Sequence, residues 1–412
     1  MKVSVLTLGC RVNQSESDII ESNLKKYGWS IVGLCEYPDY CIVNTCTVTS
    51  KSDYQSRQLI RRAVRSGAEV IVTGCYSQIR PDEIRNIKGN ISIIDNNDKL
   101  RIINMLTGKL SSNAYNYGSR SRPYLKIQDG CNFACTYCTI PIARGKSRSL
   151  SVQEIVRQAK EIEEANFNEI VLTGINIGTY GFDLNPTTKL STLIKTLLRE
   201  TKIKRIRLSS IEVKNVNKEL IELFQENRIC KHLHLPLQSG DDYILKLMNR
   251  NYTSKYYIKT LENIVKNIPD IAVGTDVVVG FPGEGRREFL NTKNLLDYLP
   301  ITYLHIFPFS SRPNTLASKM SMQTSFTIKK ERYNELKALN IHKKKSYLLT
   351  QLNKTLDVIV EEQCMDNTSV GTSSNYLKVK MPFNGYPKGS LIDVWVYGIE
   401  TDFVYAKPIY MM

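Results

Sequence analysis

The sequence has no apolar run that approaches the length of a membrane-spanning helix. Such a helix needs about 20 consecutive apolar residues, and no hydrophobic stretch in this 412-residue chain comes near that length. A secretory signal is also missing, since the amino terminus, MKVSVLTLGC, has one lysine and a short apolar run that ends in Gly-Cys. We therefore expect a protein of the reducing cytoplasm that does not bind a membrane.

Histidine is rare, with four residues at positions 232, 234, 305 and 342, whereas cysteine is common, with ten residues. Without a secretory signal, so many cysteines in a long chain do not indicate a secreted disulfide framework. Hydrophobic residues make up 42% and charged residues 23%, which excludes a disordered composition. At roughly 100 to 200 residues per domain, the length predicts two to four folded domains.

Acidic residues are too few to balance the basic ones, and the net charge is +16. Residues 119–344 carry 35 basic and 22 acidic side chains, whereas residues 345–412 carry 6 and 7. A basic excess of this size favours a polyanionic partner such as nucleic acid. We expect that partner to contact the central part of the chain.

Three apolar runs near the amino terminus, VSVLTLGC, YCIVNTC and VIVTGC, have the composition of buried parallel strands. Helical patterns over 15–27 and 51–66 separate them. The runs end on Cys10, Cys46 and Cys75. Because the carboxyl ends of parallel strands meet along one sheet edge, where ligands bind, these cysteines are predicted to converge. We assign residues 1–110 to this α/β parallel-sheet domain.

Strand and helix patterns alternate through residues 117–345, which we assign to a central domain. The expected strands lie near 124–128, 169–173, 203–209, 232–237, 272–280 and 301–307. A capping box of Ser151 and Glu154 opens the first intervening helix, and later helices are expected over 189–200, 217–228, 241–267 and 287–298. Six such units predict a partial, open (β/α)6 barrel with its active site at the carboxyl ends of the strands.

The carboxyl-terminal residues 346–412 come after a long polar helix. Their pattern of strand-forming segments predicts a small antiparallel β-barrel. The segments TLDVIVEE, YLKVKMPF, SLIDVWVYGIE and FVYAKPI are separated by glycine, proline and asparagine turns. Tyr376, Phe383, Tyr386 and Trp395 are candidates for stacking on nucleic-acid bases. Packing in the barrel core is the alternative for most of them.

Three cysteines, Cys131, Cys135 and Cys138, form a Cys-x3-Cys-x2-Cys loop directly after the first barrel strand. Soft thiolates in this arrangement select an iron–sulfur cluster or zinc. Structural zinc takes four protein ligands, and the four histidines lie far away in sequence, although folding can supply one. Three ligands on a cluster of four irons leave one iron open for a small molecule, and we favour this interpretation.

The loop GCNFACTYCTIPIARGKSRS at the head of a six-strand barrel resembles that of the radical S-adenosylmethionine (SAM) enzymes, and the whole chain resembles their methylthiotransferase family. The other matching stretches are TLGCRVNQSES, NTCTVT, VTGCYSQ, RIRLSSIE, HLHLPLQSG, GTDVVVGFPGE and HIFPFSSRP. The resemblance implies an amino-terminal three-cysteine domain, a radical SAM barrel and a small β-barrel called TRAM. It also implies that Cys10, Cys46 and Cys75 hold a second [4Fe-4S] cluster, which carries the sulfur to be inserted.

The chemistry that the resemblance implies uses SAM twice. One molecule methylates the sulfur at the amino-terminal cluster, and another, chelated by the open iron of the barrel cluster, is split to methionine and a 5′-deoxyadenosyl radical. The radical removes the hydrogen from C2 of an adenine, and the methylthio group joins that carbon. An electron donor for the barrel cluster is implied as well.

The stretches TLGCRVNQSES and IPIARGKSRS look most like the branch that acts on N6-threonylcarbamoyladenosine at position 37 of tRNA. The isopentenyladenosine branch typically has GCQMN at the first cysteine, and the branch that modifies an aspartate of a ribosomal protein favours a Lys-Asn pair. Both remain alternatives. A non-catalytic RNA-binding or iron-sensing protein is a further one, although sites with three cysteines argue against closed structural clusters.

Polar residues at the ends of the barrel strands are the expected SAM ligands, with an ordinary turn or capping role as the alternative: Thr173, Gly174, Asn176, Ser210, Glu212, Gln238 and Asp276. Basic residues on both sides of the cluster loop are expected to draw RNA to the active site: Arg120, Arg122, Arg144, Lys146 and Arg148. A second basic candidate is the helix that carries Arg61, Arg62 and Arg65, for which a solvated helix face is the alternative.

The remaining cysteines, at 35, 41, 230 and 364, fit no ligand pattern, and we predict that replacing them leaves both clusters in place. Cys41 lies within an apolar strand and is expected to pack as a small hydrophobic residue. Anaerobically reconstituted Cys41→Ala should therefore bind about eight irons per chain, as the unmodified protein should. Iron analysis that finds about four would overturn the ligand assignment.

Overall fold

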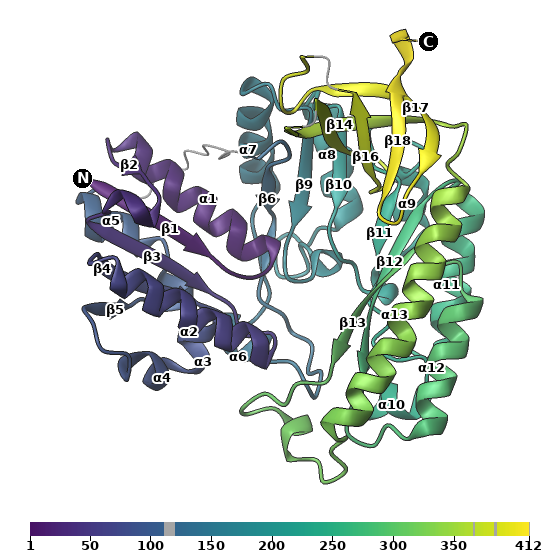
Figure 1. Cartoon of the computed structure of the whole chain (residues 1–412), viewed down its shortest axis with the longest axis horizontal. Coiled ribbons are helices and arrows are strands. Elements are labelled where there is room, and N and C mark those ends of the chain that lie inside the picture. Colours follow the sequence, from purple (N-terminus) through teal and green to yellow (C-terminus); the bar gives the residue numbers. More distant parts are fainter. Residues whose placement is uncertain (111–119, 366, 383–384, 412) are drawn as a thin grey trace.

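The computed structural model describes residues 1–110, 120–365, 367–382 and 385–411, and three units follow one another along the chain (Figure 1). The expected start of the central domain at 117, and Phe383, lie outside these residues. Among the described helices, none is both long enough and apolar enough to cross a membrane.

The amino-terminal unit is a parallel sheet between helices, as expected. Its strand order is β2-β1-β3-β4-β5, and every pairing is parallel. The strands are β1 (Lys2–Thr7), β2 (Ser30–Ile31), β3 (Tyr40–Thr45), β4 (Glu69–Gly74) and β5 (Ile91–Ile93). The helices are α1 (Arg11–Lys26), α2 (Ser50–Arg65), α3 (Cys75–Ile79), α4 (Pro81–Arg85) and α5 (Arg101–Thr107).

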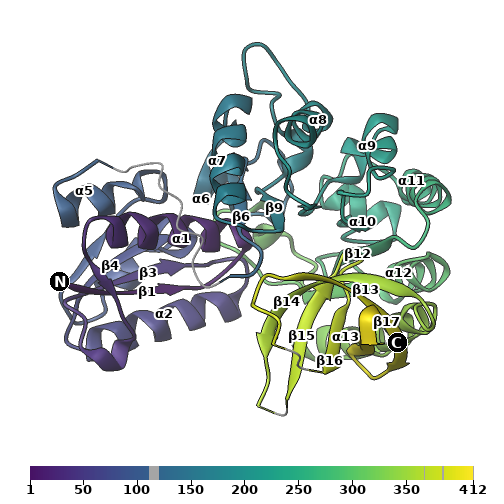
Figure 2. The same ribbon diagram turned by 90° about the horizontal axis from the view of Figure 1, so that it is seen from above.

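Alternating side chains of β3 pack on opposite faces of this sheet. Ile42 contacts the cluster that includes Ile20 of α1, whereas Cys41 and Val43 pack with Ile60 of α2. Figure 2 shows α1 and α2 on the two faces. Cys41 is fully buried, in agreement with its expected packing role.

The central unit is an open barrel of six parallel strands, each at its expected position. One sheet has the order β10-β9-β6, made of β6 (Tyr124–Lys126), β9 (Glu169–Thr173) and β10 (Arg205–Leu208). The other has the order β11-β12-β13, made of β11 (His232–His234), β12 (Ala272–Val279) and β13 (Tyr303–Pro308). Main-chain hydrogen bonds join the two sheets, from Ile211 N to His234 O and from Cys230 N to Ile206 O, both 3.0 Å.

Helices cover the outside of the barrel: α7 (Val152–Glu164), α8 (Leu190–Glu200), α9 (Lys218–Leu223), α10 (Asp242–Leu247), α11 (Ser254–Asn267), α12 (Arg286–Tyr298) and α13 (Phe326–Leu349). The single helix expected over 241–267 is wrong. Asn249 has a left-handed backbone with φ of 57°, which ends a helix, and Thr253 caps a new one. The capping box is half formed, because Ser151 accepts from the Glu154 N–H whereas the Glu154 carboxylate binds Arg157.

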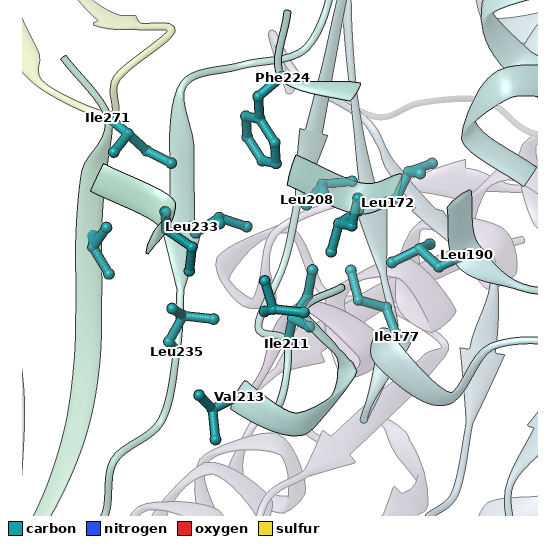
Figure 3. Packing of buried hydrophobic residues seen from close by; sticks show 14 of the residues in the cluster. Leu172, Ile177, Leu190, Leu208, Ile211, Val213, Phe224, Leu233, Leu235 and Ile271 are labelled. Carbon is teal, nitrogen blue, oxygen red and sulfur yellow. The ribbon is translucent and has the colours of Figure 1, made fainter. Parts of the chain in front are cut away.

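The two faces of the barrel strands differ in polarity. Leu172, Leu208 and Leu233 point outward into the core under the helices (Figure 3). Because side chains alternate along a strand, the intervening residues face inward, and these include Glu169, Arg207 and His232, all buried. The inside of the barrel is therefore polar and charged.

The carboxyl-terminal unit is a closed barrel in the order β14-β15-β16-β18-β17. Its strands are β14 (Thr355–Gln363), β15 (Thr368–Ser373), β16 (Lys378–Pro382), β17 (Leu391–Ile399) and β18 (Phe403–Pro408). Four pairings are antiparallel, as expected, whereas β16 and β18 run parallel. Tyr376, Tyr386 and Trp395 are half-buried, and none belongs to the buried core of this barrel.

Buried charges dock this small barrel onto the central one. Glu169 is completely buried and pairs with Arg205 at 2.6 Å and Arg207 at 2.7 Å. Arg207 also donates to the carbonyl of Ser373, the last residue of β15 in the small barrel, at 2.8 Å. Burial by itself raises the pKa of Glu169, but the arginines lower it to about 2.

We predict that Glu169→Gln destabilises the protein, because the substitution leaves buried guanidinium groups without a carboxylate. Breaking such a pair costs about 3–5 kcal/mol of unfolding free energy. Since the folded pKa of about 2 lies below the unfolded value of about 4.3, the stabilisation is complete above pH ~4.3 and is lost as the pH falls toward 2. Urea unfolding of the cluster-free protein measures both effects.

The control for this prediction is Glu362→Gln on β14, where the glutamate is exposed. Such a surface change should alter the unfolding free energy by less than about 0.5 kcal/mol. Equal urea midpoints for the two variants at pH 7 would contradict the proposed role of Glu169.

Candidate active site

The first cysteine trio lies in the loop that follows β7 (Gln128–Asp129) and precedes α6 (Ile140–Arg144). The loop turns at Gly130, where φ is 69° and a Cβ would lie 2.1 Å from the Lys146 carbonyl oxygen. The three sulfur-bearing residues line one pocket of about 630 Å³ together with Asn132, Phe133, Lys146 and Thr315. This pocket is at the carboxyl end of the barrel strands, where the sequence predicts the active site.

Hydrogen bonds hold two of these sulfurs. The Phe133 N–H donates to Cys131 Sγ at 3.4 Å, and the Arg250 guanidinium donates to Cys135 Sγ at 3.3 Å. Burial raises the pKa of Cys131, and it raises the pKa of Cys138 to about 12. Burial thus disfavours the thiolate form of Cys131 and Cys138, and binding of a metal by these residues would release their protons.

The second trio lies at the centre of the amino-terminal sheet. In the order β2-β1-β3-β4-β5, connections leave β1 and β3 in opposite directions, and the carboxyl ends at this switch point form a ligand crevice. Cys10 follows β1 and Cys46 follows β3, while Cys75 begins α3 directly after β4. The structure therefore brings the three cysteines to one sheet edge.

Two glycines allow this convergence. Gly9 has φ of 121°, and a Cβ there would lie 2.9 Å from Cys46 Cβ. Gly74 has φ of 103°, and a Cβ would lie 2.4 Å from the Thr45 carbonyl oxygen. Burial raises the pKa of Cys46 to about 11 and also raises that of Cys75.

The cysteine geometry fits a cluster better than a single zinc ion. Over the described residues, the one trio of histidine, cysteine or carboxylate ligand atoms that all lie within 4.8 Å of one another is His234, Asp276 and His305. Zinc–sulfur bonds of about 2.3 Å in a tetrahedron hold sulfurs about 3.8 Å apart, so neither cysteine trio is closed around one ion. Separated trios of thiolates suit a [4Fe-4S] cluster with an open iron.

A buried ion cluster connects the two trios; we call it the Glu16 cluster. Glu16 of α1 accepts from Lys126 at 3.0 Å and from Arg144 at 2.9 Å, and it also pairs with Lys99. Arg144 pairs with Asp129 at 2.9 Å. Burial by itself raises the pKa of Glu16, but the three cations hold it well below its usual range.

The Glu16 cluster reaches both cysteine sites. Arg144 ends α6, just after the first trio, and donates to Asn13. Asn13 in turn donates to the carbonyls of Leu8 and Thr45, each at 2.9 Å. These carbonyls belong to the segments that lead into Cys10 and Cys46, so the cluster holds the two sites in a fixed relation.

The prediction that Arg144 contacts RNA is wrong, because its side chain is fully buried in the Glu16 cluster. Arg120 pairs with Asp18 at 3.1 Å, and Arg122 pairs with Glu361 and Glu169, so protein carboxylates occupy both guanidinium groups. Lys146 and Arg148 are exposed at the cluster loop. Arg61, Arg62 and Arg65 are exposed on α2.

Asn176 has the strongest signature of a ligand contact among the expected SAM residues. It is 5% exposed, and neither its side-chain nitrogen nor its oxygen has a partner within the described structure. Buried amides are normally hydrogen-bonded. Asn176 lines a pocket of about 380 Å³ with Asn132 and Phe133 of the cluster loop.

The other expected SAM residues differ in burial and in their hydrogen-bond partners. Thr173 is buried, Ser210 is half-buried, and Gly174 packs against Gln128. Gln238 has φ of 67°. Glu212 pairs with Arg250, the residue that holds Cys135. Asp276 lies inside the barrel, where His234 at 2.8 Å and His305 at 3.2 Å contact its carboxylate.

Sequence reasoning missed Arg250 and the inward-facing His234 and His305. The histidines carried a signal, because HLH and YLHIFP are strands in which alternate positions face the barrel interior. No sequence signal pointed to Arg250, because it lies more than 100 residues from Cys135 in the sequence.

Comparisons with known proteins agree with this architecture. The model of the radical SAM superfamily matches residues 125–296, and that of the uncharacterized protein family UPF0004 matches residues 2–95. The threonylcarbamoyladenosine tRNA methylthiotransferase MtaB of Aquifex aeolicus is 38% identical over 96% of this chain and 100% of its own. That of Bacillus subtilis is 37% identical over 92% and 89%. The tRNA-2-methylthio-N(6)-dimethylallyladenosine synthase of Acetivibrio thermocellus is 29% identical over 96% and 88%.

This protein is a radical SAM enzyme and belongs to the methylthiotransferase family. Members of the family use SAM and [4Fe-4S] clusters. Among solved structures, the radical S-adenosylmethionine methyltransferase TsrM of Kitasatospora setae has a TM-score of 0.56 at 12% identity and covers 77% of each chain. This likeness shows the fold alone.

We predict that Lys146→Gln weakens RNA binding in a salt-dependent way, because its exposed ammonium group lies beside the cysteine loop, where the sequence analysis expects RNA. The slope of log affinity against log salt should fall by about one. Lys195→Gln on the outer helix α8, also exposed, is the control and should leave the slope unchanged. Filter binding of unmodified tRNA at several salt concentrations measures both slopes, and an unchanged slope for Lys146→Gln would remove the residue from the interface.

Proposed function

We propose that this protein converts N6-threonylcarbamoyladenosine at position 37 of tRNA to its 2-methylthio derivative. The observation that carries the proposal is the pair of cysteine trios, placed at strand carboxyl ends of two domains and joined by the buried Glu16 cluster. Relatives named for this activity match along nearly the whole chain. The stretch TLGCRVNQSES favours this substrate over isopentenyladenosine or a ribosomal aspartate.

The residues present divide the work between the two sites. We propose that Cys131, Cys135 and Cys138 hold the cluster that supplies the SAM-derived radical, and that Cys10, Cys46 and Cys75 hold the cluster that supplies sulfur. Arg250 orients Cys135 and is itself held by Glu212. We assign Asn176 to SAM, because its buried amide lacks a protein partner in the described structure. Lys146 and Arg148, which are exposed next to the cysteine loop, contact RNA.

The reaction consumes electrons, so the proposal includes an external electron donor to the barrel cluster. A cytoplasmic location fits a tRNA substrate and a set of reduced thiols. Over the described residues every cysteine is free of disulfide bonds.

We predict opposite failures for two cysteine variants. Cys135→Ala should form no 5′-deoxyadenosine from SAM, because it removes a ligand of the radical-generating cluster. Cys46→Ala should still form 5′-deoxyadenosine but transfer no methylthio group. Chromatography of anaerobic reactions with SAM and dithionite measures the first product, and mass spectrometry of tRNA nucleosides measures the second. Sulfur transfer by Cys46→Ala would mean that the second cluster is misplaced.

The substrate itself is tested by nucleoside analysis of a deletion strain. The proposal requires the 2-methylthio derivative of N6-threonylcarbamoyladenosine to disappear and to return with the gene. Loss of the isopentenyladenosine derivative instead, or unaltered nucleosides with an unmodified ribosomal aspartate, would assign the protein to another branch.

A further inference from the structure

A row of aromatic rings lies on the inward face of β13, the last strand of the barrel. Tyr303, His305 and Phe307 occupy alternate positions, with ring centroids 5.2 Å and 6.5 Å apart, while Leu304 and Ile306 between them pack in the core. The His305 side chain is 54% exposed and Phe307 is 36% exposed. In the described sheet β13 pairs only with β12, so it is an edge strand. The aromatic row therefore faces the open side of the barrel.

A pocket of about 290 Å³ lies at the base of this row, between β13, α13 and the carboxyl-terminal barrel. Tyr303 and His305 line it together with the basic residues Arg122, Lys344 and Lys378. The side chains of Lys344 and Lys378 are 39% and 49% exposed and pair with Asp402 and Glu361. The Lys344–Asp402 pair is exposed on both sides and contributes little stability, so a phosphate can replace Asp402. Glu361, by contrast, is 19% exposed and also pairs with Arg122, so it stays in place beside Lys378.

The carboxyl end of β13 leads to the junction of the two cluster-bearing domains. Two residues beyond β13, Ser310 contacts Ser50 of α2 at 2.8 Å. Arg312 pairs with Asp53 of the same helix at 2.6 Å. The row thus runs along β13 from the side of the carboxyl-terminal barrel toward the contact with α2 (Figure 1).

We propose that the aromatic row and its basal pocket bind the single-stranded nucleotides that flank the modified adenosine. Bases stack on the rings of β13, and phosphates meet Lys344 and Lys378. Aromatic rings beside positive charge are the recurring means of binding single-stranded nucleic acid. This arrangement explains how a carboxyl-terminal barrel without net positive charge takes part, since α13 supplies one of the lysines. The inference rests on the proposed tRNA substrate.

The test measures binding of an anticodon stem-loop to the reconstituted full-length protein by fluorescence anisotropy, without oxygen. Phe307→Ala should raise the dissociation constant about 5-fold to 150-fold, the effect of losing one stacked base. Phe307→Trp, which keeps a ring, should restore binding. Tyr298→Ala is the matched control, because Tyr298 is an exposed aromatic residue on the outer helix α12. Lys344→Gln should lower the salt slope by about one.

Two further measurements separate stacking from general effects. A fully paired RNA duplex should bind Phe307→Ala and the unmodified protein equally, and both proteins should contain the same iron and form the same 5′-deoxyadenosine without RNA. The proposed role of the aromatic row would be refuted if Phe307→Ala lost duplex and stem-loop binding equally. It would also be refuted if Phe307→Ala bound the stem-loop as well as the unmodified protein does. If the unmodified protein does not bind the stem-loop at all, the result contradicts the proposed tRNA function instead.

Discussion

The buried carboxylate of Glu16 is the constraint on which the active site depends. A buried charge is tolerated only when cations and hydrogen bonds compensate it. The partners of Glu16, which are Lys99, Lys126 and Arg144, come from both the amino-terminal and the central domain. The compensation exists only when the two domains are docked. The same contacts position the loops of both cysteine trios. The interactions that dock the two domains therefore also set the relative position of the two cysteine sites.

A second set of buried charges acts at the opposite end of the barrel. Six strands leave the barrel open, and its inward face carries Glu169, Arg205 and Arg207 without enough partners of its own. Main-chain carbonyls of residues 357 and 372–374 accept further hydrogen bonds from the two arginines. Tyr376 of the same segment accepts a hydrogen bond at 2.8 Å from Arg11, the neighbour of Cys10, so the carboxyl-terminal barrel also contacts the auxiliary cysteine loop.

The charge of the molecule divides into two kinds of basic residue that the sequence does not distinguish. Arg144 and Arg207 neutralise buried carboxylates, whereas Lys146, Arg148 and Lys344 remain at the surface. Net charge alone therefore overstates what is available to RNA. The aromatic row of β13, in which His305 and Phe307 are exposed, offers a contact of another type that needs no net charge.

The amino-acid sequence by itself determined the order of the domains, the six barrel strands and the six cysteines at strand ends, because apolar periodicity and residue spacing are local properties. Only the tertiary structure decided the parallel pairing of β16 with β18, the break of a helix at Asn249 and the burial of Arg144. It also decided that Arg250 holds Cys135. Each of these depends on pairings or on a backbone conformation that neighbours in space select. Arg144 and Glu16 are 128 positions apart, and no local pattern states which charges folding will bury together.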